Sequence, residues 1–98
     1  MIHHVVTFRW KEGVDTAHVE SVATALRRLP SIIPELAAYA CGADLGLAPT
    51  NFEFAVAAQF ASVEDYVVYR DHPEHQTIIK SMIAPFVSER CAVQFSSH

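Results

Sequence analysis

Bulky and apolar side chains change their spacing along the first half of the chain, and each spacing predicts one element. From 4 to 10 they alternate with other residues, which is typical of a strand with one buried face. From 15 to 29 they recur every three or four residues, which indicates an amphipathic helix that Asp15 can cap. A second strand is interpreted at 36–41, after two prolines that bracket an irregular turn.

The second half opens with the one long loop, 42–50, and then repeats the same two patterns. Alternation is strong from 52 to 60. Helical spacing follows from 63 to about 86, with Ser62 placed to cap the first turn, and a closing strand alternates from 91 to 96. The predicted order of elements is therefore β-α-β-β-α-β.

That order predicts an α+β fold of the ferredoxin-like βαββαβ type, in which one antiparallel four-stranded sheet carries both helices on one face. The larger apolar set is predicted to face the helices and comprises Val6, Phe8, Trp10, Phe54, Val56, Phe60, Val93 and Phe95. The set predicted for the other, open face comprises Val5, Thr7, Ala38, Ala40, Ala55, Ala57, Ala92 and Gln94. A bare face with so little charge favours an interface, so we expect a homodimer that pairs the two open faces. The second and fourth strands should lie at opposite edges, too far apart for a bridge between Cys41 and Cys91.

Composition and charge narrow the class of protein. The 98 residues are expected to form a single domain, 1–98, because 51% are hydrophobic, 18% are charged and three are glycine. The net charge of −4, with seven scattered Lys and Arg, argues against nucleic acid as a partner. The chain starts with no recognisable export signal, and no segment is long and apolar enough to enter a membrane. We therefore expect a cytoplasmic protein with reduced thiols and no membrane partner.

Protonatable side chains are densest in one run, Tyr69-Arg70-Asp71-His72-Pro73-Glu74-His75. Pro73 disfavours helical geometry at His72 and suits the first position of a new helix, so the run predicts a helix break with His72 as the cap of the second helix. His72 and His75 are three residues apart, but Pro73 disrupts the helical face that a metal pair would need, and no metal is expected. The helix N-terminus disfavours a charged His75 whereas Glu74 favours it, which leaves the direction of its pKa shift open.

Several segments together resemble the stress-responsive A/B barrel (Dabb) family. They are His4-Val5-Val6-Thr7-Phe8-Arg9-Trp10-Lys11, Gly42, Phe60-Ala61-Ser62-Val63-Glu64-Asp65 and, most specific, the Tyr-x-x-His-Pro-x-His run from 69 to 75. The resemblance covers nearly the whole chain and implies a dimeric α/β barrel built from ferredoxin-like protomers. It implies no single activity, because many members of that family have none assigned.

The resemblance also implies candidate site residues. One plant member of the family is a polyketide cyclase that closes a linear chain by an intramolecular aldol reaction without a cofactor. By motif position its general base matches His75, its tyrosine partner matches Tyr69, and a first-strand histidine matches His4. A further pocket histidine falls on Phe54, so an aromatic wall is expected in place of that polar contact. Such chemistry needs a base beside a carbonyl and a donor for the developing oxyanion, but no cofactor.

Each of these residues also has a structural interpretation. His75 could bond a local carbonyl, Tyr69 could be a packed aromatic with its hydroxyl bonded, and His4 could be a satisfied core histidine. Two functional classes therefore stay open. The broader one is a stress-associated homodimer that binds a small apolar ligand, with structural histidines and no assigned activity. The alternative is a polyketide cyclase-like enzyme that acts on a small apolar carbonyl compound with His75 as general base. An enzyme requires His4, Tyr69 and His75 to meet at one cavity.

Overall fold

The computed structural model describes residues 1–97, so the predicted domain boundary at residue 98 lies outside the described residues. The strands are β1 (Ile2–Trp10), β2 (Ala38–Ala43), β3 (Phe54–Phe60) and β4 (Val87–Ser96). The helices are α1 (Thr16–Arg27), α2 (Val63–Asp71) and α3 (Pro73–Ile78), with the short helical turns η1 (Leu29–Ser31), η2 (Ile79–Ile83) and η3 (Ala84–Phe86). Within the described range, no helix has the length and apolar character that a membrane crossing requires.

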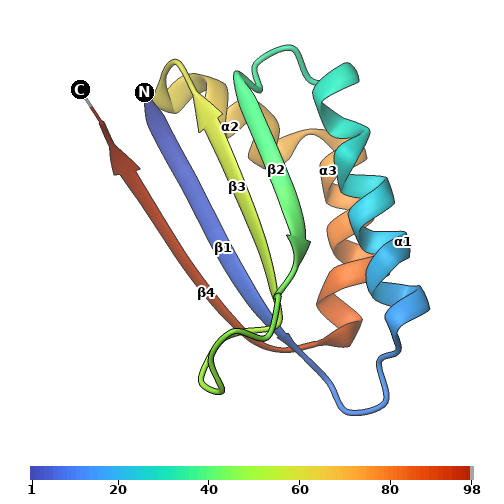
Figure 1. Cartoon of the computed structure of the whole chain (residues 1–98). Coiled ribbons are helices and arrows are strands. Elements are labelled where there is room, and N and C mark those ends of the chain that lie inside the picture. Colours follow the sequence, from blue (N-terminus) through green and yellow to red (C-terminus); the bar gives the residue numbers. More distant parts are fainter. Residues whose placement is uncertain (98) are drawn as a thin grey trace.

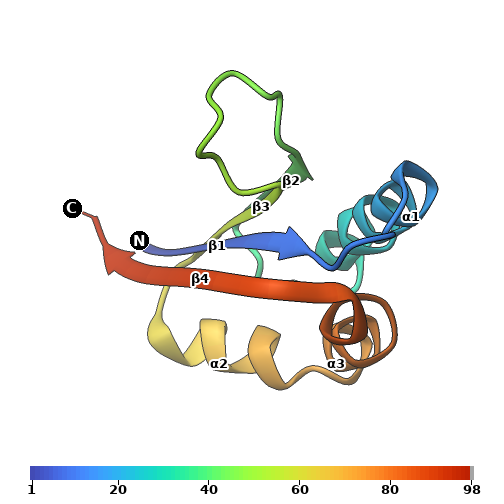
Figure 2. The same ribbon diagram turned by 90° about the horizontal axis from the view of Figure 1, so that it is seen from below.

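The strands form one antiparallel sheet in the order β2-β3-β1-β4, with the helices on one of its faces (Figure 1). Seen from below, α2 and α3 lie on one side of the strands, whereas the loop between β2 and β3 projects on the other side (Figure 2). This is the ferredoxin-like α+β sandwich that the order of elements predicts. Because β2 and β4 form opposite edges, Cys41 and Cys91 are held apart, and both are free thiols.

The core lies between the sheet and the helices. On β1 and β3 every second residue is buried, as predicted, because the strand period of two sends these side chains to one side. Helix α1 begins at the predicted cap, where the Asp15 carboxylate accepts from the His18 backbone N–H at 2.9 Å. The most deeply buried large side chains are Phe54, Phe60, Leu26, Leu29, Ile33 and Val22.

The closing strand faces the other way from the prediction. Its register pairs Val93 with Val5, and directly paired residues share a face, so Val93 and Phe95 lie on the open face and not in the core. Their side chains are 60% and 49% exposed. The prediction was wrong because it took the apolar side of this edge strand to be its buried side. Ala92 and Gln94 face the helices instead, and the open face is more apolar than expected.

The second helical region breaks where the sequence predicts. Helix α2 begins after Ser62, whose hydroxyl accepts from the Asp65 backbone N–H at 3.1 Å. His72 is extended, and its Nδ1 accepts from the Glu74 backbone N–H at 3.1 Å. His72 therefore caps α3, as predicted, and Pro73 occupies the first position of that helix.

Two strands begin two residues later than predicted. The apolar residues that suggested the earlier starts make other contacts. Leu36 is buried in the turn before β2, where its backbone N–H donates to the Ile33 carbonyl at 3.2 Å. Phe52 lies beneath the Arg9 guanidinium, whose carbon is 4.3 Å from the ring centroid.

The loop between β2 and β3 is held in shape by Asp44. Its carboxylate accepts from the Gly46 backbone N–H at 2.9 Å and from the Asn51 side-chain amide at 3.1 Å. Gly46 has a φ of 73°, a left-handed conformation that favours glycine. The loop leaves Leu45 and Leu47 83% and 84% exposed.

Candidate functional site

A cavity of about 250 Å³ lies between the sheet and the helices. Its apolar wall comprises Val6, Phe8, Leu26, Val56, Ile79 and Ile83. Its polar lining comprises His4, Tyr66, Tyr69, Arg70, His75, Gln76 and Arg90. The three predicted site residues His4, Tyr69 and His75 therefore meet at one cavity, and its apolar wall with a few polar groups is typical of a small-molecule site.

His75 lies in the first turn of α3 and is only 9% exposed. Its Nδ1 is 3.1 Å from the carbonyl oxygen of Arg70, and since a carbonyl can only accept, Nδ1 donates. Burial lowers the pKa of His75 below its ordinary value, against the opposing effect of that hydrogen bond. The sequence left the direction of the His75 pKa shift open, and the structure shows that the pKa is lowered. The ring is therefore neutral, with its lone pair on Nε2.

The acceptor that orients His75 is supplied by the end of α2. The Arg70 carbonyl lies in the last turn of that helix, where carbonyls lack helical partners. It accepts from Nδ1 of His75 and, at 2.6 Å, from the side-chain amide of Gln76. The break at Pro73 therefore helps to set the orientation of the His75 ring.

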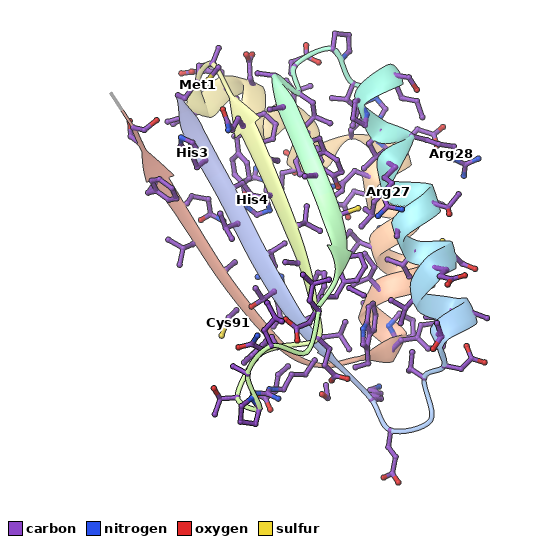
Figure 3. All side chains as sticks on the ribbon, viewed as in Figure 1. Met1, His3, His4, Arg27, Arg28 and Cys91 are labelled. Carbon is purple, nitrogen blue, oxygen red and sulfur yellow. The ribbon has the colours of Figure 1, made fainter. Side chains whose placement is uncertain are left out.

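His4 points from β1 toward the helices and is 5% exposed, whereas its neighbour His3 belongs to the open face (Figure 3). The side-chain amide nitrogen of Gln94 donates to Nδ1 of His4 at 2.8 Å. Burial first, then the positive charge of Arg90 and the proximity of His75, lower the pKa of His4 to about 4. Because Nδ1 accepts, the neutral ring carries its hydrogen on Nε2.

The two imidazoles present opposite polar groups. His4 carries an N–H at Nε2, and His75 carries a lone pair at the same position. Among residues 1–97 neither Nε2 atom has a hydrogen-bond partner, and neither is one of the fully buried unpaired atoms. Both atoms therefore keep access to solvent on residues that line the cavity, which offers one donor and one acceptor.

Tyr69 supports His75 by packing. It is 2% exposed, and its ring centroid lies 4.1 Å from that of His75 and 5.3 Å from that of Phe60. Its hydroxyl lies 3.4 Å from the Tyr39 hydroxyl, and burial raises the pKa of Tyr69 to about 12. The phenol is neutral, and its surroundings match those of a packed tyrosine with a bonded hydroxyl.

Three residues near the site were not found from the sequence. Gln94 orients His4, and its role was hidden because β4 was assigned the wrong face. Arg90 lies on the same side of β4 and lines the cavity. Tyr66 precedes Tyr69 by three residues, and its ring centroid is 5.2 Å from that of His4. Helical spacing from Tyr69 would have placed Tyr66 on the same face of α2.

Phe54 does not form the aromatic wall that the family resemblance suggested. It is 1% exposed and packs with Trp10 and Phe8, at centroid distances of 5.7 Å and 6.2 Å. The β3 residue that lines the cavity is Val56, two residues further along the strand. Phe54 is paired with Phe8, and its ring is covered by the aromatic rings of Phe8 and Trp10.

The remaining histidines of the predicted cluster and the first strand make local contacts. His72 caps α3, and His3 stacks on Phe95 with a centroid distance of 4.6 Å and an interplanar angle of 2°. Nε2 of His3 also lies 2.7 Å from the Ser97 hydroxyl. In the part of the chain that the structure describes, no three His, Cys, Asp or Glu residues are grouped as a metal site would require.

Acidification is expected to destabilise the protein through His4. Its pKa is about 4 in the folded chain against 6.5 for an unperturbed histidine. Between these values the unfolded chain binds a proton at His4 that the folded chain does not. The free energy of unfolding is therefore unaffected by His4 above pH 6.5 and decreases as the pH falls toward 4. The expected decrease in the free energy of unfolding from this residue is about 3 kcal/mol. Urea unfolding across that range measures it.

A His4→Gln variant provides the comparison. Glutamine does not titrate, so the variant should lose most of this pH dependence even if it is less stable at neutral pH. An equal decrease in the variant and the parent protein would show that His4 is not the group responsible.

The fold and site define an α+β protein of the ferredoxin-like type with a cavity between its sheet and helices. A family model described as "Stress Responsive A/B Barrel Domain" matches residues 2–97. The chain belongs to this family, also called Dabb, as the motifs at 4–11 and 69–75 suggested.

Known relatives agree with this assignment. A stress-response A/B barrel domain-containing protein of Arabidopsis thaliana is 24% identical over 95 residues, which cover 97% of this chain and 36% of the plant protein. The chain thus spans about a third of the length of that curated relative. A dimeric ferredoxin-like protein of unknown function from Thermobifida fusca is 47% identical, with a TM-score of 0.91 over 98% of this chain and 90% of that one.

A more distant structure shows the same fold in an enzyme. Hydroxynitrile lyase from Passiflora edulis is 21% identical, with a TM-score of 0.82 over 96% of this chain and 90% of that one. At this identity the likeness concerns the fold alone, since one fold hosts many functions.

Proposed function

We propose that the protein is a homodimer that binds a small, largely apolar carbonyl compound in the cavity between the sheet and the helices. The observation that carries this proposal is the pair of neutral imidazoles with opposite tautomers, His4 and His75, at one apolar cavity. The cavity of about 250 Å³ is slightly smaller than the ~300–1,000 Å³ of drug-sized sites, so it suits a small molecule.

A carbonyl group matches the polar lining. The N–H at Nε2 of His4 can donate to a carbonyl oxygen, and the lone pair at Nε2 of His75 can accept from an enol or approach the acidic carbon beside the carbonyl. Aliphatic side chains such as Val56, Ile79 and Ile83 supply the surroundings that an apolar chain or ring prefers.

The open sheet face supports the dimer. Val93 and Phe95 are exposed there, and the neighbouring Val5 is half-buried on the same face. The loop with the exposed Leu45 and Leu47 projects on this side of the sheet (Figure 2). Exposed apolar surface of this kind is typical of an interface, and homologous structures, such as that from Thermobifida fusca, are dimeric.

Ligand binding can be tested with two matched probes. We expect 2-heptanone to bind and to shift the NMR signals of His4 and His75, whereas heptane, which has no carbonyl, binds more weakly. An Ile79→Trp variant should fill the cavity and abolish the binding of 2-heptanone. Ile32→Trp is the control, because Ile32 is 42% exposed and lies outside the cavity. Equal binding of both probes, or unchanged binding by Ile79→Trp, would contradict the proposal.

A second candidate function is proton-transfer catalysis on the same carbonyl compound. The supporting observation is that His75 is neutral, with its lone pair on Nε2 in the form that a general base requires. In this reaction Nε2 of His75 takes a proton from the carbon beside the carbonyl, and the electron pair of that C–H bond delocalises onto the carbonyl oxygen. The N–H of His4 donates to the oxygen as its negative charge develops. Proton abstraction of this kind is also the first step of an intramolecular aldol cyclisation.

A further inference from the structure

We propose that the natural ligand is an oxo acid, whose carboxylate binds Arg90 at the mouth of the cavity while its carbonyl lies deeper, beside His4 and His75. This inference rests on the proposed function and adds the substrate class. It depends on the position of Arg90, on its lack of an acidic partner, and on its separation from His4 along the sheet.

Arg90 reaches the cavity from the edge strand. In the register of β4 it is paired with Phe8, whose side chain faces the core and is 3% exposed. Paired residues share a face, so Arg90 also lies on the helix side of the sheet, where it lines the cavity. Arg90 is exposed whereas His4 and His75 are buried, which places the guanidinium toward solvent and the imidazoles inside.

The other arginine of the cavity is already neutralised. Arg70 donates to both carboxylate oxygens of Asp71, at 2.9 Å and 3.1 Å. In residues 1–97, by contrast, Arg90 makes no ion pair and no side-chain hydrogen bond. The cavity therefore has one uncompensated positive charge, and that charge is at its mouth.

A single uncompensated guanidinium favours a carboxylate among anionic groups. The planar donor fork of arginine matches the two oxygens of a carboxylate, and the two charges cancel. A phosphate monoester, which carries a charge of about −1.5 to −2 near neutral pH, would leave negative charge beside an apolar wall. The positive charge of Arg90 also helps to keep His4 in its neutral, donating form, so the same residue serves both ends of the ligand.

The sheet register separates the two ligand groups. His4 is paired with Gln94 and Phe8 with Arg90, so the two levels are four residues apart on β1. At the rise of a strand this is about 13 Å between Cα atoms, and the long side chain of Arg90 spans part of it, because its charge acts on His4. The carboxylate and the carbonyl are therefore expected to be separated by several carbon atoms, as in 6-oxoheptanoate, and not adjacent, as in its isomer 2-oxoheptanoate.

Binding constants of four probes test the inference. We expect 6-oxoheptanoate to bind about tenfold to a hundredfold more tightly than 2-heptanone, which has a methyl group in place of the carboxylate. It should also bind more tightly than 2-oxoheptanoate and than 5-oxohexyl phosphate. The advantage over 2-heptanone should shrink at high salt, because Arg90 is exposed.

Two arginine variants complete the experiment. Arg90→Gln should remove the advantage of 6-oxoheptanoate over 2-heptanone, with both affinities measured in the same variant. Arg28→Gln removes the same charge at the residue that follows α1, whose side chain points away from the sheet (Figure 3), and should leave the binding of both compounds unchanged. If 2-heptanone binds but 6-oxoheptanoate has no Arg90-dependent advantage, the oxo-acid inference fails while the proposed carbonyl site stands. If 6-oxoheptanoate binds through Arg90 in the Ile79→Trp variant as well, the carboxylate is held outside the cavity and the inference also fails.

Discussion

Replacing Ala57 with glutamate is expected to dissociate the dimer or to unfold the protein. Ala57 is exposed in the protomer and lies near the middle of the open face, paired with Val5 on β1 and with Ala40 on β2. If two such faces pack together, each copy places a carboxylate between apolar surfaces, and an unpaired buried charge costs several kcal/mol. Native mass spectrometry and light scattering at micromolar concentration would detect the loss of the dimer.

The matched control introduces the same charge on another surface. Ala17 is exposed in the first turn of α1, where a glutamate is compatible with the helix N-terminus, so Ala17→Glu should remain dimeric and folded. A stable dimer of the Ala57→Glu variant would show that the interface is elsewhere, and the open face would then need another explanation.

Replacing His75 with alanine is expected to lower proton-transfer activity by ~10²–10⁴-fold, the usual contribution of a general base. The reaction can be followed by NMR as exchange of deuterium from D₂O into the carbons beside the carbonyl of 2-heptanone. Because the pKa of His75 is below its ordinary value, the rate in the parent protein should be near its plateau at neutral pH and should fall only on acidification.

The control for this experiment is Thr77→Ala, an exposed position on α3 that should leave the exchange rate unchanged. Ligand binding must also be measured, since His75→Ala should still bind 2-heptanone, with weaker affinity. If binding persists and the exchange rate of His75→Ala equals that of the parent protein, His75 is not the base. If the parent protein binds 2-heptanone but shows no exchange above the buffer rate, the proton-transfer function is wrong and the binding function stands.

Much of the fold could be predicted because apolar residues recur with the period of a strand in some segments and with that of a helix in others. Strong alternation on β1 and β3 is enough to sort their side chains between two faces, and Pro73 is enough to locate the break and its cap at His72. The faces of β4 were harder to assign, because its apolar residues lie on the open face, which a partner subunit would cover. Only the register of β4 with β1 shows which of its side chains face the helices.

The sequence was enough to select residues that line one cavity, but not to predict their tautomers; that they form a functional site stays a prediction. Motif positions led to His4, Tyr69 and His75, which do meet at one cavity. The tautomer of each imidazole depends on whether Nδ1 meets a donor or an acceptor. Gln94 is far from His4 in the sequence, and the acceptor for His75 is a backbone carbonyl, which no side-chain pattern identifies. Burial, which settles the direction of the pKa shift of His75, likewise appears only after packing.

The helix break has a consequence for how this chain can vary. In an uninterrupted helix the Arg70 carbonyl would accept from the backbone N–H of Glu74. In this chain that N–H donates to His72, and the carbonyl is left for the imidazole of His75. The number of residues between Arg70 and His75 therefore cannot change freely, since one residue inserted before His75 in α3 would turn its side chain by ~100° about the helix axis. Side chains within the interval can change, but its length cannot change without losing the orientation of the ring.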